Sequence, residues 1–177
     1  KNHFYIFGQP GTKKYLRQIV DHPYTLPLKD LQIKVSVKGL KEGLNLPPKT
    51  PFKIEAQYLF HADPCFGYRL MIEKKIIAFC TDTGNCPAIL KLAENADLLI
   101  TECGLLPRQR SGAWPHLNPE EAARVAKSAK AEKLLLIHFA PHLYQNIKDR
   151  IKAQKSASKI FPHIQIGFDG MVLHLIN

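Results

Sequence analysis

The sequence predicts a single α/β layered domain in which a mixed sheet carries helices on one face. Short apolar runs, typical of buried strands, alternate along the chain with segments whose apolar residues recur at helical spacing. The 177 residues are 45% hydrophobic, which is enough for one domain with a sizeable core. Because no internal repeat or second domain boundary is visible, residues 1–177 are treated as one unit.

The first part of the chain predicts two short strands that flank a helix. Phe4 to Phe7 is an apolar run, and the segment 8–11 (GQPG) is typical of a turn. Thr12 is the expected cap of a helix whose apolar positions recur as far as Val20. Apolar and polar residues then alternate from Ile33 to Val37, which indicates a half-buried strand.

The middle of the chain predicts a mobile loop followed by strands. Residues 38–51 are rich in proline, glycine and lysine and are expected to form this loop. After it we expect a strand at 52–60, a hairpin of strands at 66–73 and 75–81, a helix at 87–94 and a strand at 98–100.

A strong helix start opens the last third of the chain. Asn118 is a good cap, Pro119 suits the first helical position, and Glu121 lies three residues beyond the cap. This helix is expected to run to about Ala131. The remaining predicted elements are a buried strand at 134–137, a basic helix from 144 to about 156, and closing strands at 164–166 and 171–175.

Composition favours a cytoplasmic protein with anionic partners. The net charge is 25 − 15 = +10, which attracts nucleic acid or phosphorylated metabolites. No run approaches the ~20 apolar residues of a membrane span, and the start of the sequence lacks a secretory pattern. The four cysteines form no C-x-x-C pair and are expected to be reduced thiols.

Ionisable side chains follow four of the predicted strands. His61, Asp82, Glu102 and His138 each stand at or just after the end of an apolar run. Since ligands bind at the carboxyl ends of strands in open α/β sheets, these residues are expected to converge. Imidazole and carboxylate are suitable ligands for zinc, manganese or iron. Singly, each has an ordinary explanation, such as a hydrogen-bonded histidine or a turn aspartate, so the joint arrangement carries the hypothesis.

Six short segments together resemble the metallo-β-lactamase fold in its ribonuclease Z form. Their order and spacing hold from about residue 4 to residue 175. The segments are FGQPG at 7–11, YLFH with CFGYR at 58–61 and 65–69, TDTG at 81–84, TEC at 101–103, PHLN at 115–118 and IHF at 137–139.

The resemblance implies a metal-dependent hydrolase. His61 would bind one metal ion and His138 the second, with Asp82 bridging both. Two zinc ions are expected, with manganese or iron as alternatives, and they would activate a water whose pKa falls toward ~7. Glu102 and His116 would form a proton relay, in which His116 lies near the leaving oxygen. The other explanation for His116 is a loop residue that hydrogen-bonds the start of the helix.

This sequence departs from the family pattern in two places. The family's H-x-H-x-D-H motif is absent, so residues 1–177 are expected to be the C-terminal half of a four-layered αββα sandwich, or else a degenerate homologue. A half alone would expose the inner face of its sheet, which predicts association with the missing N-terminal half or a homodimer. The link from Arg69 to Thr81 is also short, where ribonuclease Z enzymes carry a long insertion.

Three functions remain open from the sequence. The favoured one is hydrolysis of a phosphodiester, with RNA as substrate, supported by the motifs and the positive charge. The second is hydrolysis of a small ester, lactone or sulfate ester at the same metals. The third is a catalytically incomplete scaffold or basic binding subunit. Basic residues that would contact phosphate, or simply form a solvated surface, are Lys38, Lys41, Lys49, Lys53, Lys148, Arg150, Lys152, Lys155 and Lys159.

Overall fold

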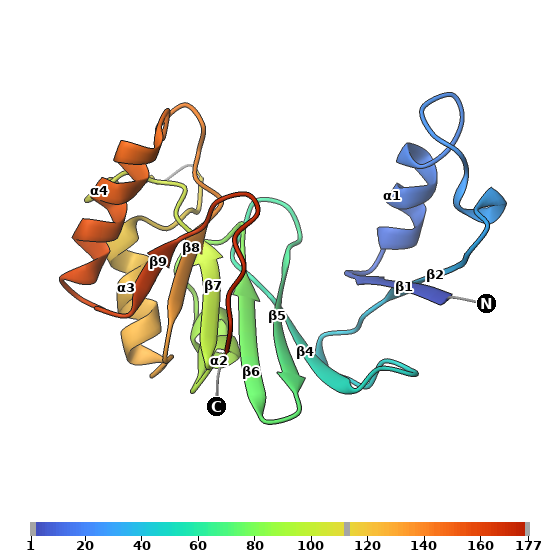
Figure 1. The fold of residues 1–177 in the computed structure, drawn as a ribbon, viewed down its shortest axis with the longest axis horizontal. Coiled ribbons are helices and arrows are strands. Elements are labelled where there is room, and N and C mark those ends of the chain that lie inside the picture. The colour runs from blue at the N-terminus through green and yellow to red at the C-terminus, as the bar shows by residue number, and fades with distance from the viewer. Residues whose placement is uncertain (1–2, 112–113, 176–177) are drawn as a thin grey trace.

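The computed structural model describes residues 3–111 and 114–175 (Figure 1). A seven-stranded mixed sheet has the order β3-β4-β5-β6-β7-β8-β9, and β1 and β2 form a separate parallel pair. Pairing is antiparallel from β3 to β6 and parallel from β6 to β9. The elements are β1 (His3–Gly8), α1 (Thr12–Ile19), the 3-10 helix η1 (Leu28–Asp30), β2 (Lys34–Gly39), β3 (Gly43–Asn45), β4 (Phe52–Tyr58), β5 (Phe66–Ile72), β6 (Lys75–Cys80), α2 (Pro87–Ala93), β7 (Leu98–Glu102), α3 (Pro119–Ser128), β8 (Leu134–Ile137), α4 (Ile147–Ser158) and β9 (Ile164–Ile166).

The main core lies between the large sheet and the helices α2, α3 and α4, as the α/β prediction required (Figure 1). Along β6, every second side chain points into this core. Ala78 and Cys80 are fully buried, and they share the core with Ile89 and Leu92 of α2. Short alanine side chains on α3 let this helix lie close to the strands that it covers. The predicted capping box at Asn118 is present and sets the start of α3.

The opposite face of the sheet is only half-buried. Ile77, Phe79 and Ile100 alternate with the core residues of β6 and β7 and point away from the helices. The strand expected at 171–175 is wrong, because this segment has no strand pairing. A turn at Asp169–Gly170, where Gly170 has φ +80°, redirects the chain beyond β9, so the segment crosses the open face instead of extending the sheet (Figure 1).

Three predicted boundaries differ from the structure. The segment 38–51 is not only a loop, since Gly43–Asn45 forms β3 against β4. The helix predicted from Thr12 is capped instead by Gly11, whose φ of +93° favours glycine, while Thr12 is the first helical residue. The late helix begins at Ile147 with Asn146 as its cap, which leaves Tyr144 buried in the loop before the helix.

An N-terminal unit of β1, α1, η1 and β2 has little core of its own. No residue of α1 is buried, and Tyr15 and Ile19 are exposed. Figure 1 shows this unit beside β4, at the end of the molecule opposite α4. Its packing is therefore much looser than that of the layered body, which consists of the seven-stranded sheet and helices α2, α3 and α4.

Asp97 joins the beginnings of β6 and β7. Its carboxylate accepts hydrogen bonds from Lys75 Nζ at 2.9 Å and from the Ile76 N–H at 2.7 Å. Burial pushes the pKa of this carboxyl upward, but the bonds from Lys75 and Ile76 outweigh burial and the pKa lies below its ordinary value. The stabilisation is therefore present above the unfolded pKa of ~3.9 and is lost as pH falls through the lower folded value.

We expect Asp97→Asn to lower the free energy of unfolding by about 1–2 kcal/mol at neutral pH, because two bonds to a charged acceptor are weakened. The difference between the variant and the wild type should shrink once pH falls below the folded pKa of Asp97. Urea denaturation of both proteins at pH 7 and at about pH 3 measures this. The exposed Asp30 provides the control Asp30→Asn, which should change little at either pH. A loss that is equal at both pH values would contradict a role for the charge.

Candidate metal centre

Three neighbouring parallel strands end at the same edge of the sheet. Asp82 follows the end of β6 by two residues, Glu102 is the last residue of β7, and His138 follows β8 directly. Because β6, β7 and β8 are parallel and adjacent, their carboxyl ends deliver these side chains to one place. The predicted convergence of Asp82, Glu102 and His138 is thus a property of the sheet order.

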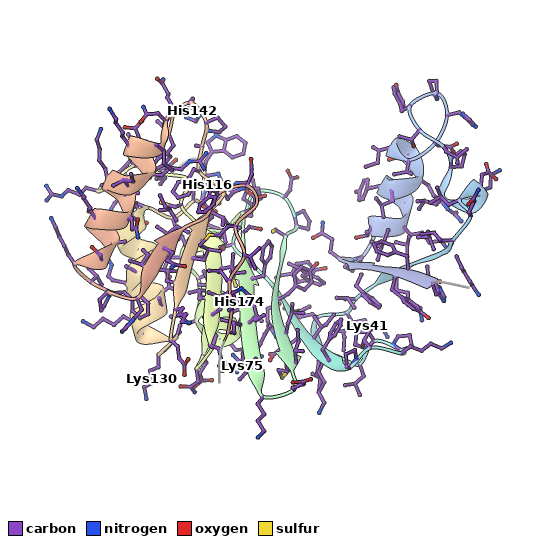
Figure 2. The ribbon with its side chains drawn as sticks, in the orientation of Figure 1. Lys41, Lys75, His116, Lys130, His142 and His174 are labelled. Carbon is purple, nitrogen blue, oxygen red and sulfur yellow. The ribbon has the colours of Figure 1, made fainter. Side chains whose placement is uncertain are left out.

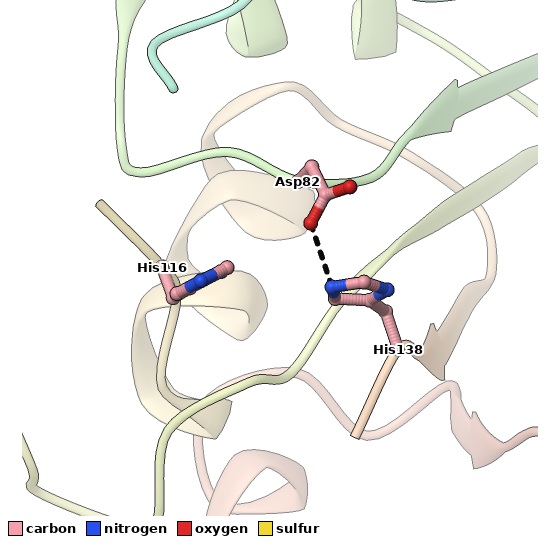
Figure 3. Close-up of side chains that lie close together, drawn as sticks. All are labelled: Asp82, His116 and His138. Carbon is pink, nitrogen blue, oxygen red and sulfur yellow. Dashed lines mark ion pairs between the residues drawn. The ribbon is translucent and has the colours of Figure 1, made fainter. Parts of the chain in front are cut away.

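Asp82, His116 and His138 form a cluster of metal-capable side chains (Figure 3). One ligand atom from each lies within 4.8 Å of the others. His138 Nε2 is 2.7 Å from Asp82 Oδ1, and the rings of His116 and His138 are 6.0 Å apart between centroids. The side chains of His138 and Asp82 are 43% and 41% exposed, so the cluster is open on one side. Two imidazoles and a carboxylate are a donor set that fits zinc, manganese or iron.

The backbone of two cluster residues lies in the left-handed region. Asp82 has φ +52° and His138 has φ +53°, although neither is glycine. Such conformations cost about 1–3 kcal/mol each and persist where the surrounding structure imposes them. Here the left-handed residues stand at the ends of β6 and β8, where the backbone turn brings their side chains into contact. Formation of the cluster is therefore accompanied by local backbone strain at Asp82 and His138.

Glu102 is buried and contacts the cluster through His116. Its carboxylate is fully buried and accepts the Thr83 N–H at 2.5 Å, the Gly104 N–H at 3.2 Å and the Leu117 N–H at 3.1 Å. Both of its oxygens also lie near Nδ1 of His116, at 2.9 and 3.0 Å. Since the carboxylate is surrounded by donors, His116 donates from Nδ1. Nε2 is then the ring nitrogen that is left available to a ligand or a proton.

Gly104 leaves room for this contact between Glu102 and His116. A Cβ at position 104 would lie 3.0 Å from Glu102 Oε2 and 3.2 Å from the His116 side chain. The His116 ring would have to move to accommodate it. A larger residue at this position would therefore crowd the contact between Glu102 and His116.

Tyr144 ties the loop that carries His138 to the loop that follows Glu102. Its hydroxyl donates to the Leu105 carbonyl at 2.6 Å and lies 3.4 Å from Cys103 Sγ. The Tyr144 ring packs against Phe139, with centroids 4.9 Å apart. Burial raises the pKa of the Tyr144 hydroxyl far above its ordinary value, so it remains a donor at neutral pH. The sequence interpretation missed this contact because it assigned Tyr144 to a helix.

His61 lies next to the cluster rather than within it. The strand expected at 52–60 ends at Tyr58, so His61 stands in the following loop. Its ring centroid is 5.7 Å from that of His116, and its Nδ1 accepts the Asp63 N–H at 3.3 Å. The structure therefore completes the group of three with His116, which the sequence interpretation assigned only to a proton relay. A ligand role for His61 stays a prediction.

The cysteines near the site are protonated thiols. All four cysteines are free. Burial, with the nearby Asp82 carboxylate, raises the pKa of Cys65 to about 11, and Cys65 donates to the Thr81 carbonyl at 3.3 Å. Burial raises the pKa of Cys103 to about 12. Both thiols are therefore protonated at neutral pH.

The mixed sheet carries helices on one face and a cluster of metal-capable side chains at its carboxyl edge. These features together define a protein of the metallo-β-lactamase fold. The family model described as beta-lactamase superfamily domain matches residues 2–139. The chain belongs to this family, and within it the chain is ribonuclease Z-like. None of the helices in residues 3–111 and 114–175 has the length and apolar character needed to cross a membrane.

Three named relatives are 27–33% identical to this chain over the aligned segments. Ribonuclease Z of Gloeothece citriformis (strain PCC 7424) is 33% identical over 217 residues, covering 93% of this chain and 67% of that protein. Ribonuclease Z of Microcystis aeruginosa is 27% identical, and its alignment also covers 93% of this chain and 67% of that protein. The probable metallo-hydrolase YhfI of Bacillus subtilis is 30% identical, covering 69% of this chain and 51% of YhfI.

Solved structures share the fold. The crystal structure of YhfI from Bacillus subtilis has a TM-score of 0.75 at 22% identity, over 96% of this chain and 64% of that one. The short form of human tRNase Z has a TM-score of 0.68 at 21% identity, over 98% of this chain and 68% of that one. The 217-residue alignment with the Gloeothece protein is longer than this 177-residue chain, so that relative carries residues that this chain lacks.

Proposed function

We propose that this chain supplies part of the catalytic site of a metal-dependent phosphodiesterase that acts on RNA. The observation that carries the proposal is the convergence of Asp82, His116 and His138 at the carboxyl edge of the sheet, with the buried Glu102 in contact with His116. Two relatives named ribonuclease Z, each aligned over 93% of the chain, support RNA as the substrate. The net charge of +10 also favours a polyanion.

The residues divide into ligands and a proton relay. Asp82 and His138, with His61 beside them, would hold divalent ions, for which we propose zinc before manganese or iron. Bound ions would polarise phosphoryl oxygens and lower the pKa of water toward ~7. His116 would take up a proton at Nε2 from the attacking water and pass it to the leaving oxygen, while Glu102 holds the proton on Nδ1 and keeps the ring in place.

The half-buried sheet face suggests how the whole protein is organised. We propose that a missing N-terminal half bearing the H-x-H-x-D-H motif, or else a second copy of this chain, covers Phe79, Ile100 and their neighbours. Burial of this face would remove an apolar patch from water. The motif of the N-terminal half would also supply further metal ligands. The reduced thiols are consistent with a cytoplasmic location. Sedimentation of the 177-residue chain as a well-folded monomer would contradict the need for a cover.

The proposed function is tested with the zinc-loaded complete protein on an RNA substrate and on a small ester, across a range of salt concentrations. We expect RNA cleavage whose kcat/KM falls steeply with salt, because phosphate contacts release counterions. Rapid hydrolysis of a small ester or lactone with no RNA cleavage would favour the alternative substrate class. A protein that retains no metal and cleaves neither substrate would be a scaffold.

A further inference from the structure

A hollow with a basic rim lies within the N-terminal unit, far along the molecule from the metal centre. Its volume is about 520 Å³, and it lies between α1, η1 and β2. Figure 2 shows His116 in the layered body, whereas α1 and β2 lie at the other end of the molecule. We call this feature the basic hollow, and its cationic lining residues are Lys13, Arg17, Lys29 and Lys38.

The four cations of the basic hollow have no partner of opposite charge. No ion pair involves any of them within residues 3–111 and 114–175, and all four side chains are exposed. Asp21 is the one carboxylate among the described lining residues, and it accepts the His22 N–H. Like charges gathered around a concave surface raise its positive potential and attract anions. The remaining lining residues are Val20, Pro27, Leu28, Val35, Ser36 and Val37.

The form of the basic hollow suits a strand better than a small anion. A compact phosphate site encloses its ligand with fixed N–H donors, whereas these cations are long, exposed side chains from three separate elements. Tyr24, which is 79% accessible, lies at the edge of the hollow, because its N–H donates to the carbonyl of the lining residue Asp21 at 3.0 Å. Basic side chains that follow a backbone, with aromatic rings available for stacking, are the features of single-stranded nucleic acid sites.

We propose that the basic hollow binds the backbone of a single-stranded segment of RNA. This inference rests on the proposed function, because it assumes that the substrate of the metal centre is RNA. The chain would then hold its substrate at two separate places, with the basic hollow contributing affinity and the metal centre contributing the chemistry. A short substrate that reaches only the metal centre would lose this contribution.

The test compares two neutralised variants of the complete protein, which change net charge equally. Lys13→Gln with Arg17→Gln removes two cations from the basic hollow, and Lys74→Gln with Lys127→Gln removes two exposed cations elsewhere. Binding of a fluorescent single-stranded RNA oligonucleotide is measured by anisotropy over a range of salt, in chelator so that no cleavage occurs. The first variant should lose ~10-fold or more in affinity and reduce the salt slope by about 1.4, at ~0.7 per lost phosphate contact.

Tyr24→Ala provides a second variant that does not depend on charge, and it should weaken RNA binding by ~5-fold or more through lost stacking. Equal losses in the two neutralised variants, or no loss with Tyr24→Ala, would overturn the proposal. Displacement of the RNA by millimolar inorganic phosphate would reassign the hollow to a small anion, and equally tight binding of polyglutamate would reassign it to an acidic protein. Because binding is measured without metal, failure of RNA cleavage by the wild type would count against the proposed function alone.

Discussion

Replacement of Asp82 by asparagine in the complete protein is expected to abolish metal binding and hydrolysis together. Asp82 is in direct contact with His138 and is the carboxylate of the cluster. Asparagine tolerates the left-handed backbone at φ +52° better than most residues, so the variant keeps the local fold while losing the charge. Since residues that only support metal ligands already contribute 10–100-fold to affinity, we expect a loss of more than ~100-fold. Metal content by elemental analysis and kcat/KM on RNA measure the two effects.

His116→Ala is the matched comparison for Asp82→Asn. If His116 serves as the proton relay, the variant should keep its metal and slow turnover by ~10²–10⁴-fold. Equal loss of metal in both variants would instead make His116 a ligand, in agreement with its place in the cluster. The exposed Asp63 supplies the control Asp63→Asn, which should keep both metal and activity. Retention of metal by Asp82→Asn would remove Asp82 from the ligand set.

Glu102→Gln is expected to lower the free energy of unfolding by about 3 kcal/mol or more. The buried carboxylate accepts three backbone N–H groups as well as His116 Nδ1. A glutamine has one oxygen, and its amide group would direct N–H donors at other donors, which leaves buried groups unpaired at about 1–3 kcal/mol each. Urea denaturation measures the loss, and the exposed Glu132→Gln serves as the control.

The same Glu102→Gln variant should change the protonation of the His116 ring. With the carboxylate present, the proton resides on Nδ1, and without it the ring loses the partner that holds that tautomer. Nitrogen NMR of the His116 ring distinguishes the two tautomers. A ring that keeps its Nδ1 proton in a variant of unchanged stability would show that Glu102 does not set the His116 tautomer.

Local signals predicted most of the layered body. The capping box at Asn118, the apolar runs of β7 and β8 and the proline at the start of α2 each involve neighbouring residues, so the sequence displays them directly. Predictions failed where long-range packing decided the outcome. The segment 171–175 alternates like a strand, but the turn at Gly170 directs it across the sheet instead of along its edge.

The site shows the same division between local and long-range information. The residue type at each strand end was visible in the sequence, since Asp82, Glu102 and His138 follow apolar runs. The N–H donors around Glu102, the burial of Tyr144 and the place of His116 in the cluster were not visible. These contacts join residues from different loops, and their geometry depends on how the strands are ordered and how each loop leaves its strand.

Short-range periodicity and capping were enough to predict most of the strands and helices and to place ionisable residues where strands end. The tertiary structure alone decided which of those residues touch. Adjacent parallel strands β6, β7 and β8 deliver them to one edge, and left-handed turns at Asp82 and His138 bring their side chains together. It also gathered the cations of α1, η1 and β2 around the basic hollow, since only packing brings these separate elements around one space.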